Sequence, residues 1–192
     1  MTQKDSEPRY TEAGIATFIE KGGMEDIDDI FTFLKSRYPD TYQGVTPELT
    51  REIVSSHAES EDYRIRATAG FKEYLSNADK GAIFVARRGR EVVGYSTAFI
   101  DAEGKHWMRD LYTFPQGIGT GRKLLGAVLD WHQQHQSRGD NDIYLWVAPK
   151  TRAVRFYFHQ GFRLSGEYGG STWESGKHLP LIEMRLPVLK TR

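Results

Sequence analysis

The sequence contains no cysteine among its 192 residues and no long apolar segment. The absence of cysteine excludes disulfides, thiolate metal sites and acyl transfer through an acyl-cysteine. No run of about 18 or more apolar residues occurs, so no segment resembles a membrane-spanning helix. The stretch from Met1 to Tyr10 is polar and lacks the apolar core of a secretory signal. We therefore expect a cytoplasmic protein without a membrane partner.

The sequence also has no net charge, with 26 Lys and Arg against 26 Asp and Glu, but the charge is divided unevenly. Residues 1–79 carry 16 acidic and 9 basic side chains, a net charge of −7, and residues 80–192 carry 10 acidic and 17 basic ones, a net charge of +7. A basic half suits the phosphates of a cofactor, and an acidic half could attract a cationic acceptor; the alternative is that each face is simply solvated. No stripe of Lys and Arg with interleaved aromatic residues occurs, so we do not expect a nucleic-acid partner.

Length and a hydrophobic content of 39% predict one globular domain over residues 12–192, preceded by a flexible N-terminus over residues 1–11. Hydrophobic periodicity divides this domain into a helical half and a strand-rich half. The first half is expected to contain a strand at 14–20 and helices at 24–38, 46–56 and 61–76. Pro39 should end the first helix, and Thr46 with Pro47 should begin the second.

The second half of the chain reads mainly as strands. These are expected at 82–88, 91–100, 108–113, 142–147, 163–167 and 181–186, with helices at 121–136, closed by Gly139, and at 150–161. The glycine-rich segment from Tyr168 to His178 is expected to be mobile. The fold class is therefore α/β (α+β), a mixed, mostly antiparallel sheet of about seven strands with helices on both faces and one parallel step. A C-terminal edge strand could pair with a second copy to form a homodimer.

The most informative stretch runs from Met108 to Leu125 and reads as a strand, a glycine-rich turn and a helix. Pro115 ends the strand, and Gly117, Gly119 and Gly121 allow a ligand to approach the backbone at positive φ. The helix start presents unpaired N–H groups and the positive end of the dipole, which favours an anion such as a pyrophosphate. The alternative is a purely structural turn. The glycine spacing fits neither a phosphate loop ending in Gly-Lys-Ser/Thr nor the dinucleotide fingerprint.

Two cations, Arg122 and Lys123, occupy the first turn of this helix, where they oppose the helix dipole. Cations are unfavourable in the first turn of a helix, so their presence at a candidate site points to function. Contact with ligand phosphates would explain why they are there. The alternative is a pair of solvated side chains.

Two motifs in this half resemble the GNAT superfamily of N-acetyltransferases over residues 82–186. The first is Gln116-x-x-Gly119-x-Gly121 followed by Leu124-Leu125, and the second is Ala153-x-x-x-Tyr157-x-x-x-Gly161-Phe162 after a strand. The resemblance implies acetyl-CoA as co-substrate, no metal, and direct transfer to an amine. It also implies that the pantetheine arm pairs with the backbone of Leu111, Tyr112 and Thr113. The pyrophosphate would bind at Gln116, Gly117, Ile118, Gly119, Thr120, Gly121 and Arg122.

The resemblance suggests two catalytic residues. Tyr157 stands where the family often has its general acid, although it could be a core tyrosine. Asp110 could serve as general base or relay the proton through water, or it could pair structurally with Arg109. Tyr42 and Glu48 are weaker candidates for the acceptor pocket.

The chain departs from the family pattern twice. Pro115 directly precedes Gln116, which shortens the connection from strand to loop. Lys150 replaces an asparagine that commonly contacts the pantetheine or the acceptor, so that contact could be lost, and Lys150 itself is a candidate cofactor-binding residue. Neither change removes the phosphate cradle.

The sequence thus predicts an acetyl-CoA-dependent N-acetyltransferase acting on a primary amine of a small molecule, polyamine-like or aminoglycoside-like. A protein or peptide amine is the second choice of acceptor, and a non-catalytic acyl-CoA sensor or a nucleotide-binding domain are rival functions. His132 and His135 are three residues apart on a helix but lack a third ligand for a metal. The four tryptophans and the stripe Tyr63, Phe71 and Tyr74 are expected in the core.

Overall fold

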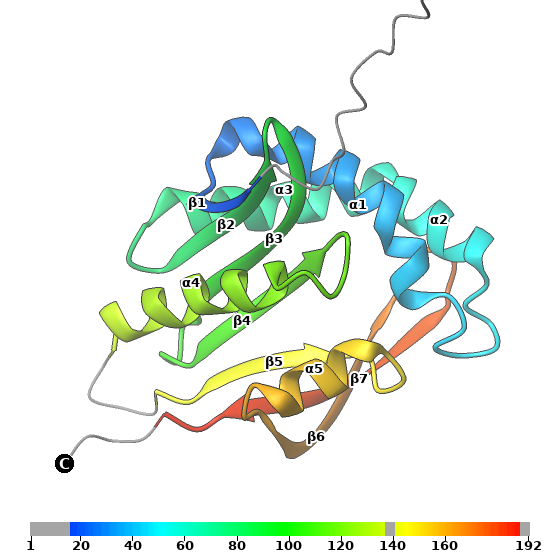
Figure 1. The fold of residues 1–192 in the computed structure, drawn as a ribbon. Coiled ribbons are helices and arrows are strands. Elements are labelled where there is room, and N and C mark those ends of the chain that lie inside the picture. Colours follow the sequence, from blue (N-terminus) through cyan, green and yellow to red (C-terminus); the bar gives the residue numbers. More distant parts are fainter. Residues whose placement is uncertain (1–15, 137–140, 189–192) are drawn as a thin grey trace, which may run out of the picture.

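The computed structural model describes residues 16–136 and 141–188, and within these ranges seven strands form one sheet in the order β1-β2-β3-β4-β5-β7-β6. Every neighbouring pair is antiparallel except β4 and β5, which are parallel. The strands are β1 (Thr17–Lys21), β2 (Gly81–Arg88), β3 (Glu91–Ile100), β4 (His106–Thr113), β5 (Ile143–Val147), β6 (Arg163–Thr172) and β7 (His178–Leu186). The predicted mixed, mostly antiparallel sheet is confirmed (Figure 1).

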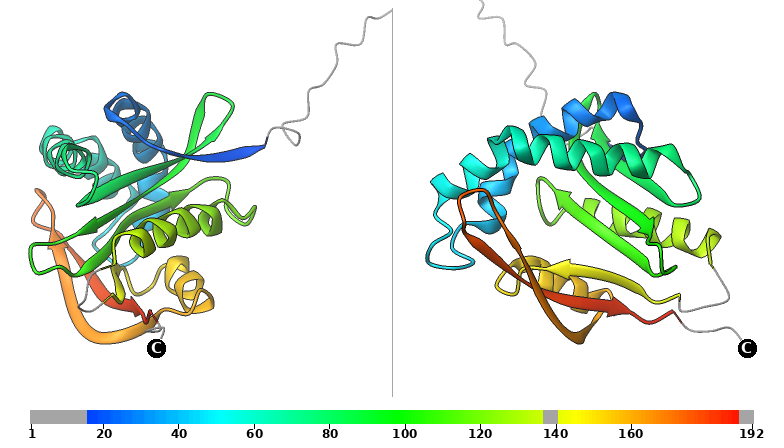
Figure 2. Two further views of the ribbon diagram at one scale, coloured as in Figure 1. Left: turned by 90° about the vertical axis from the view of Figure 1, so that its left-hand side faces the viewer. Right: turned by 180° about the vertical axis from the view of Figure 1, so that it is seen from behind.

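Helices cover both faces of the sheet, as predicted (Figures 1 and 2). The short η2 (Met24–Asp26), α1 (Ile27–Tyr42), α2 (Arg51–Glu59) and α3 (Glu61–Ser76) precede β2, whereas α4 (Thr120–Gln134) and α5 (Arg152–His159) flank β5 in the chain. The core has two parts. One part lies between the sheet and helices α1–α3 and includes Ile30 and Leu34 of α1. The other lies on the opposite face and includes Leu124 and Val128 of α4. Burial of these apolar faces holds the layers together.

The first two helices differ from their predicted boundaries. α1 continues through Pro39 to Tyr42, because Pro39 lies in the last turn, where it interrupts only one backbone bond, and Tyr38 and Tyr42 pack with ring centroids 4.6 Å apart. α2 begins at Arg51 instead of Thr46, since the Thr50 hydroxyl accepts a hydrogen bond from the Ile53 backbone N–H at 3.4 Å and caps the helix. Pro47 lies in the turn that precedes it.

The glycine-rich segment from Tyr168 to His178 forms regular structure, and its mobility stays a prediction. Residues 168–172 belong to β6, and β7 begins at His178. A tight turn joins them, with the Trp173 N–H donating to the Lys177 carbonyl at 2.9 Å. Trp173 is buried under the helices, and this packing fixes a turn whose composition suggests flexibility. In Figure 2 the tip of this hairpin lies beside α2.

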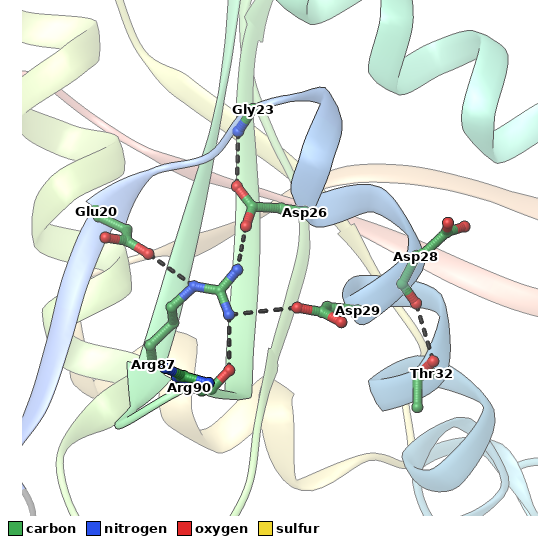
Figure 3. Close-up of polar contacts among 8 residues, drawn as sticks. All are labelled: Glu20, Gly23, Asp26, Asp28, Asp29, Thr32, Arg87 and Arg90. Atoms are coloured by element: carbon green, nitrogen blue, oxygen red, sulfur yellow. Dashed lines mark hydrogen bonds and ion pairs between the residues drawn. The ribbon is translucent and has the colours of Figure 1, made fainter.

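A cluster of charges fastens the N-terminal elements to the sheet (Figure 3). Arg87 at the end of β2 donates to Glu20 of β1 at 2.7 Å and to Asp29 of α1 at 3.4 Å, and it also pairs with Asp26 of η2. Asp26 is buried and accepts a further hydrogen bond from the Gly23 N–H at 2.8 Å. Because the guanidinium makes several charge-assisted hydrogen bonds, β1, η2 and α1 hold a fixed position relative to β2.

Three predictions concern the ends of the chain or of elements. The flexible terminus at 1–11, the start of the first strand at Gly14 and the helix end at Gly139 lie outside the described residues.

The edge strands of the sheet are β1 and β6, so β7, which lies between β5 and β6, is not the edge strand that was expected to pair with a second copy. None of the helices in the described part of the chain has the length and apolar character needed to cross a membrane.

Candidate functional site

The site is built around the place where β4 and β5 separate. Their register contains two pairs, His106 with Ile143 and Trp107 with Tyr144, and the strands diverge beyond them. A cavity of about 830 Å³ lies at this separation. It is lined by residues of both parts of the core, such as Tyr95 on the α1–α3 side and Tyr157 on the α4–α5 side. The cavity therefore passes through the sheet where the two strands diverge.

An irregularity in β4 brings Asp110 to this cavity. Thr97 pairs with Arg109 and Tyr95 with Tyr112, so two residues of β4 lie opposite one residue of β3, which is a β-bulge. Asp110 has φ = 59°, an unusual value for a residue other than glycine. The Thr97 hydroxyl donates to the Arg109 carbonyl at 2.9 Å and supports the bulge.

The Asp110 carboxylate is partly shielded from solvent and weakly paired. Its side chain is 24% exposed, and its nearest charged contact is the Arg109 Nε at 3.5 Å. Burial raises the pKa of Asp110, while the Arg109 guanidinium acts in the opposite direction. A carboxylate with a raised pKa at a cavity wall is suited to accept a proton or to bind an ammonium group.

Tyrosines surround this carboxylate. The hydroxyls of Tyr42 and Tyr112 are 2.6 Å apart and share a hydrogen bond. Burial raises the pKa of Tyr42 to about 12, the Tyr112 hydrogen bond opposes the shift and Asp110 adds to it. Burial, Tyr42 and Asp110 also raise the pKa of Tyr157 well above its ordinary value. Both hydroxyls are therefore protonated at neutral pH and able to donate hydrogen bonds.

Side chains from three elements close the cavity beneath the helices. The His57 ring of α2 stacks on Trp173 with centroids 4.3 Å apart and planes 2° from parallel, and its Nδ1 lies 2.6 Å from Glu174 Oε2. Arg66 of α3 pairs with the same carboxylate. Burial, helped by Arg66, lowers the pKa of His57 to about 4, so the neutral ring donates its Nδ1–H to Glu174. These contacts join α2 and α3 to the β6–β7 turn.

The glycine-rich loop leads into the N-terminus of α4 on the other side of the sheet. Gly117 and Gly119 have φ values of 85° and 87°, as predicted, with no heavy atom within 4 Å of an added Cβ. The prediction of positive φ is wrong for Gly121, which lies in the helix, where an added Cβ would be 3.6 Å from the Leu111 side chain. The Thr120 hydroxyl is buried and has no hydrogen-bond partner among the described residues. The loop is therefore open to a ligand, and it meets the cavity where Gly121 lies against Leu111, a lining residue.

The predicted site residues divide into two groups. Asp110, Leu111, Tyr112 and Tyr157 line the cavity, whereas Thr113, the loop residues 116–122 and Lys150 lie outside its lining. Arg122 and Lys150 are exposed. Lys123 is turned toward β1, with its Nζ 3.3 Å from the Thr17 carbonyl. Of the two weaker candidates, Tyr42 lines the cavity and the exposed Glu48 does not.

Several lining residues were not identified from the sequence. Besides His57, Arg66 and Trp173, these include Trp107 and Trp146, which were expected in the core. Trp146 is 41% exposed, although Trp131 and Trp173 are buried as predicted. Strand alternation offered a signal, because it places Trp107 on the same face of β4 as Arg109, a charged residue.

His132 of α4 and His135, which follows the helix, do not converge on a metal. His132 Nδ1 lies 2.9 Å from His106 Nδ1 in the interior, and His135 Nδ1 lies 2.7 Å from the Trp131 carbonyl. Within residues 16–136 and 141–188, no three His, Asp or Glu side chains are close enough together to hold a metal ion.

Comparison with known proteins identifies a matching family. Residues 39–162 match the model of the Acetyltransferase (GNAT) family. No curated protein sequence matches the chain.

Solved structures with the same fold span several acetyltransferases. PaiA N-acetyltransferase from Thermoplasma acidophilum, in complex with coenzyme A, is 17% identical with a TM-score of 0.63 and covers 91% of this chain and 100% of its own. Ribosomal-protein-alanine N-acetyltransferase from Brucella melitensis is 15% identical with a TM-score of 0.60 and covers 89% of this chain and 99% of its own. Phosphinothricin acetyltransferase from Sinorhizobium meliloti, in complex with acetyl-CoA, is 16% identical with a TM-score of 0.61, and the match covers 90% of this chain and 88% of that protein. At these identities the likeness is one of fold.

Proposed function

The chain belongs to the acetyltransferase (GNAT) family and is an acyltransferase, and we propose that it moves an acetyl group from acetyl-CoA directly to a primary amine of a small molecule. The observation that carries this proposal is the cavity that passes through the sheet between β4 and β5. One side of it adjoins the glycine-rich loop, and the other is lined by side chains of α1–α3. Two substrates can therefore approach the same point from opposite faces of the sheet.

The glycine-rich loop would bind the pyrophosphate of acetyl-CoA. Positive φ at Gly117 and Gly119 and the absence of side chains there leave room for phosphate oxygens beside the backbone. α4 has 15 residues, so its N-terminus supplies unpaired N–H groups and the positive end of a helix dipole. The exposed Arg122 in the first turn adds charge, and the unpartnered Thr120 hydroxyl is a further group that a ligand could satisfy.

The separated strands would bind the pantetheine arm. Beyond Trp107 and Tyr144 the facing edges of β4 and β5 no longer pair with each other. Backbone groups at Leu111, Tyr112 and Thr113 are thus near the gap and suited to an extended amide-containing chain, which would pair as an added strand does. The same N–H groups could hold the thioester carbonyl and stabilise its oxyanion during attack.

Asp110 would bind the acceptor and receive its proton. A primary amine is largely protonated at neutral pH, and only the neutral form attacks a carbonyl carbon. The carboxylate can bind the ammonium ion, and the proton then moves to Asp110 or through water to solvent. The new N–C bond forms as the C–S bond breaks, and the leaving group is the CoA thiolate.

Tyr157 would stabilise that thiolate. Its raised pKa keeps the phenol protonated, but it also exceeds the ordinary thiol pKa of about 8.5. Complete proton transfer from phenol to thiolate is therefore uphill, and Tyr157 acts mainly by donating a hydrogen bond to the sulfur as charge develops there. The thiolate then takes up its proton when CoA is released.

Other acceptors and one other activity are consistent with the family. A polyamine or an aminoglycoside would be a small-molecule acceptor, and a protein or peptide amine would be a larger one. A protein that only senses acyl-CoA would use the loop but would need neither Asp110 nor Tyr157 at the cavity. The presence of both favours catalysis.

The proposal is tested by ligand-dependent unfolding followed by a thiol-release assay. Acetyl-CoA and CoA at about 100 times their dissociation constants should add about 2.7 kcal/mol, a rise in Tm of roughly 5–10 °C, whereas NAD and ATP should not. Acetyl-CoA together with a primary amine should then release free CoA. A rise in Tm without thiol release for any amine would favour a protein that only senses acyl-CoA. The absence of a rise in Tm with both acetyl-CoA and CoA would contradict the proposal.

A further inference from the structure

One wall of the cavity consists of four aromatic rings in a row. Tyr74 of α3 stacks on Phe99 of β3 with centroids 5.1 Å apart, Phe99 on Trp107 of β4 at 6.4 Å, and Trp107 on Trp146 of β5 at 6.4 Å. The planes of successive rings differ by 17°, 12° and 14°. All four side chains line the cavity. We call this row the aromatic wall.

The aromatic wall is accessible to a ligand. Trp146 is 41% exposed, and the other three rings are half-buried. At the end of the row, Gly169 of β6 lies against the Trp146 indole, where an added Cβ would come within 3.3 Å of two ring atoms. A larger residue at position 169 would displace the indole. A ligand that covered these rings would bury a large apolar surface, which favours binding.

The charges beside the wall are suited to a ligand with a single cation. Among the described residues, the carboxylates that line the cavity are Asp101 and Asp110. Asp101 is already engaged, since it accepts hydrogen bonds from the Trp107 indole at 2.7 Å and from the Lys105 N–H at 2.8 Å. Among the described residues, the ion pair of Asp110 is the 3.5 Å contact with Arg109, so this carboxylate is available.

The other charged side chains that line the cavity in the described part of the chain are cationic. They are Arg66, which is paired with Glu174, and Arg109. The Lys105 ammonium lies 4.3 Å from the Trp107 ring centroid and 3.6 Å from that of Tyr144, and is paired with Glu183 at 3.1 Å. A second or third ammonium group on the acceptor would be desolvated near these cations, and the described lining offers it no further unengaged carboxylate. This arrangement disfavours polyamines and aminoglycosides.

We propose that the acceptor is a small monoamine with a flat, apolar body, an arylalkylamine in chemical class. Its rings lie on Trp107 and Trp146, and its ammonium group is held by Asp110 beside the gap between β4 and β5. This inference rests on the proposed function and specifies the acceptor of the same site. It also assigns Trp107 and Trp146 as residues that determine specificity.

The test compares amines of different shape and charge at saturating acetyl-CoA. The value of kcat/KM for 2-phenylethylamine should exceed those for propylamine and putrescine by about tenfold or more. Trp146→Leu should lower kcat/KM for 2-phenylethylamine about tenfold and leave the values for propylamine, and the KM for acetyl-CoA, unchanged. Tyr168→Leu is the matched control, because Tyr168 is an aromatic residue of β6, 80% exposed and outside the cavity lining, and this variant should behave as the wild type.

The outcomes separate this inference from the proposed function. Preferred acetylation of putrescine or spermidine, or an equal loss for all amines in Trp146→Leu, would overturn the arylalkylamine inference and leave the acetyltransferase intact. If no amine is acetylated, calorimetry with 2-phenylethylamine and the CoA-bound protein decides. Binding that Trp146→Leu weakens about tenfold supports the inference, and no binding overturns it. Failure of acetyl-CoA itself to bind contradicts the proposed function.

Discussion

The two sides of the cavity differ in the groups from which they are built. The side next to α4 uses the main chain: the turn at Gly117 and Gly119, the first N–H groups of a helix and the separated edges of two strands. The opposite side uses side chains from α1, α2, α3, β3, β5 and the β6–β7 turn. Backbone groups are the same in every protein of a fold, so the first side suits a shared co-substrate. The second side can change residue by residue and so can set the choice of acceptor.

Tyr157 lies where the two sides meet, and its substitution should have the largest effect. Tyr157→Phe retains the ring, which packs against Phe162 with centroids 5.4 Å apart, and removes only the hydroxyl. We expect kcat to fall about 100-fold with little change in either KM, because the hydrogen bond acts as the thiolate forms. Steady-state kinetics measure this, with Tyr168→Phe as the control. A kcat within twofold of the wild type would show that the hydroxyl takes no part in the reaction.

A methyl group at Gly119 should affect the co-substrate side alone. Gly119 and Gly89 both have positive φ, 87° and 62°, and both have open space around an added Cβ. Alanine at either position should cost about 1 kcal/mol of stability through backbone strain. Only Gly119→Ala should raise the KM for acetyl-CoA, by about tenfold, while the KM for the amine is unchanged. Similar KM values for acetyl-CoA in the two variants would argue against phosphate binding at this loop.

The buried His132 makes the stability of the protein interior depend on pH. Burial and the nearby His106 lower the pKa of His132 to about 3, although the hydrogen bond to the Trp107 carbonyl acts in the opposite direction. The unfolded chain binds the proton at about pH 6.5, so stability that is present above this pH is lost as the pH falls from about 6.5 toward 3. At pH 5 the loss is about 2 kcal/mol.

Urea unfolding at pH 7.5 and pH 5 measures this loss of stability. His132→Asn should be less stable at pH 7.5 but should show a smaller difference between the two pH values than the wild type. His178→Asn, which changes an exposed histidine of β7, is the control and should keep the wild-type difference. An unchanged difference in His132→Asn would contradict the assignment.

The smallest effect is expected from the contacts that close the acceptor side. Glu174→Gln weakens the pairing with Arg66 and His57, and the 27% exposure of the Glu174 side chain limits the cost. We expect the KM for the amine to rise about threefold and the KM for acetyl-CoA to stay the same. Glu167→Gln, at an exposed position of β6, should change neither value. A larger effect on acetyl-CoA than on the amine would mean that the two sides are not independent.

The same contrast explains what could be predicted from the sequence. The strands, the crossover through α4 and the turn at Gly117 and Gly119 depend on local patterns, which short-range periodicity and backbone geometry determine. The cavity position of Tyr157 was instead implied by the resemblance to the GNAT superfamily. The end of α1 beyond Pro39 depended on tyrosine packing, and the start of α2 depended on which of two threonines caps it.

The acceptor side could not be predicted in this way. His57 stacks on Trp173, and Trp107 on Trp146, across long separations in the sequence. Periodicity identifies such residues as apolar or aromatic but does not indicate which of them meet. The hairpin formed by the Tyr168–His178 segment has the same cause, since the buried Trp173 of its turn packs against residues distant in the sequence.

Amide hydrogen exchange with and without acetyl-CoA tests the division between the two sides most directly. The predicted result is slower exchange in peptides that cover Leu111–Thr113 and Gly117–Gly121, with unchanged exchange in the β6–β7 turn at 173–177. Protection centred on α1–α3 or on the β6–β7 turn, with none at the glycine-rich loop, would contradict the assignment of the main-chain side to acetyl-CoA.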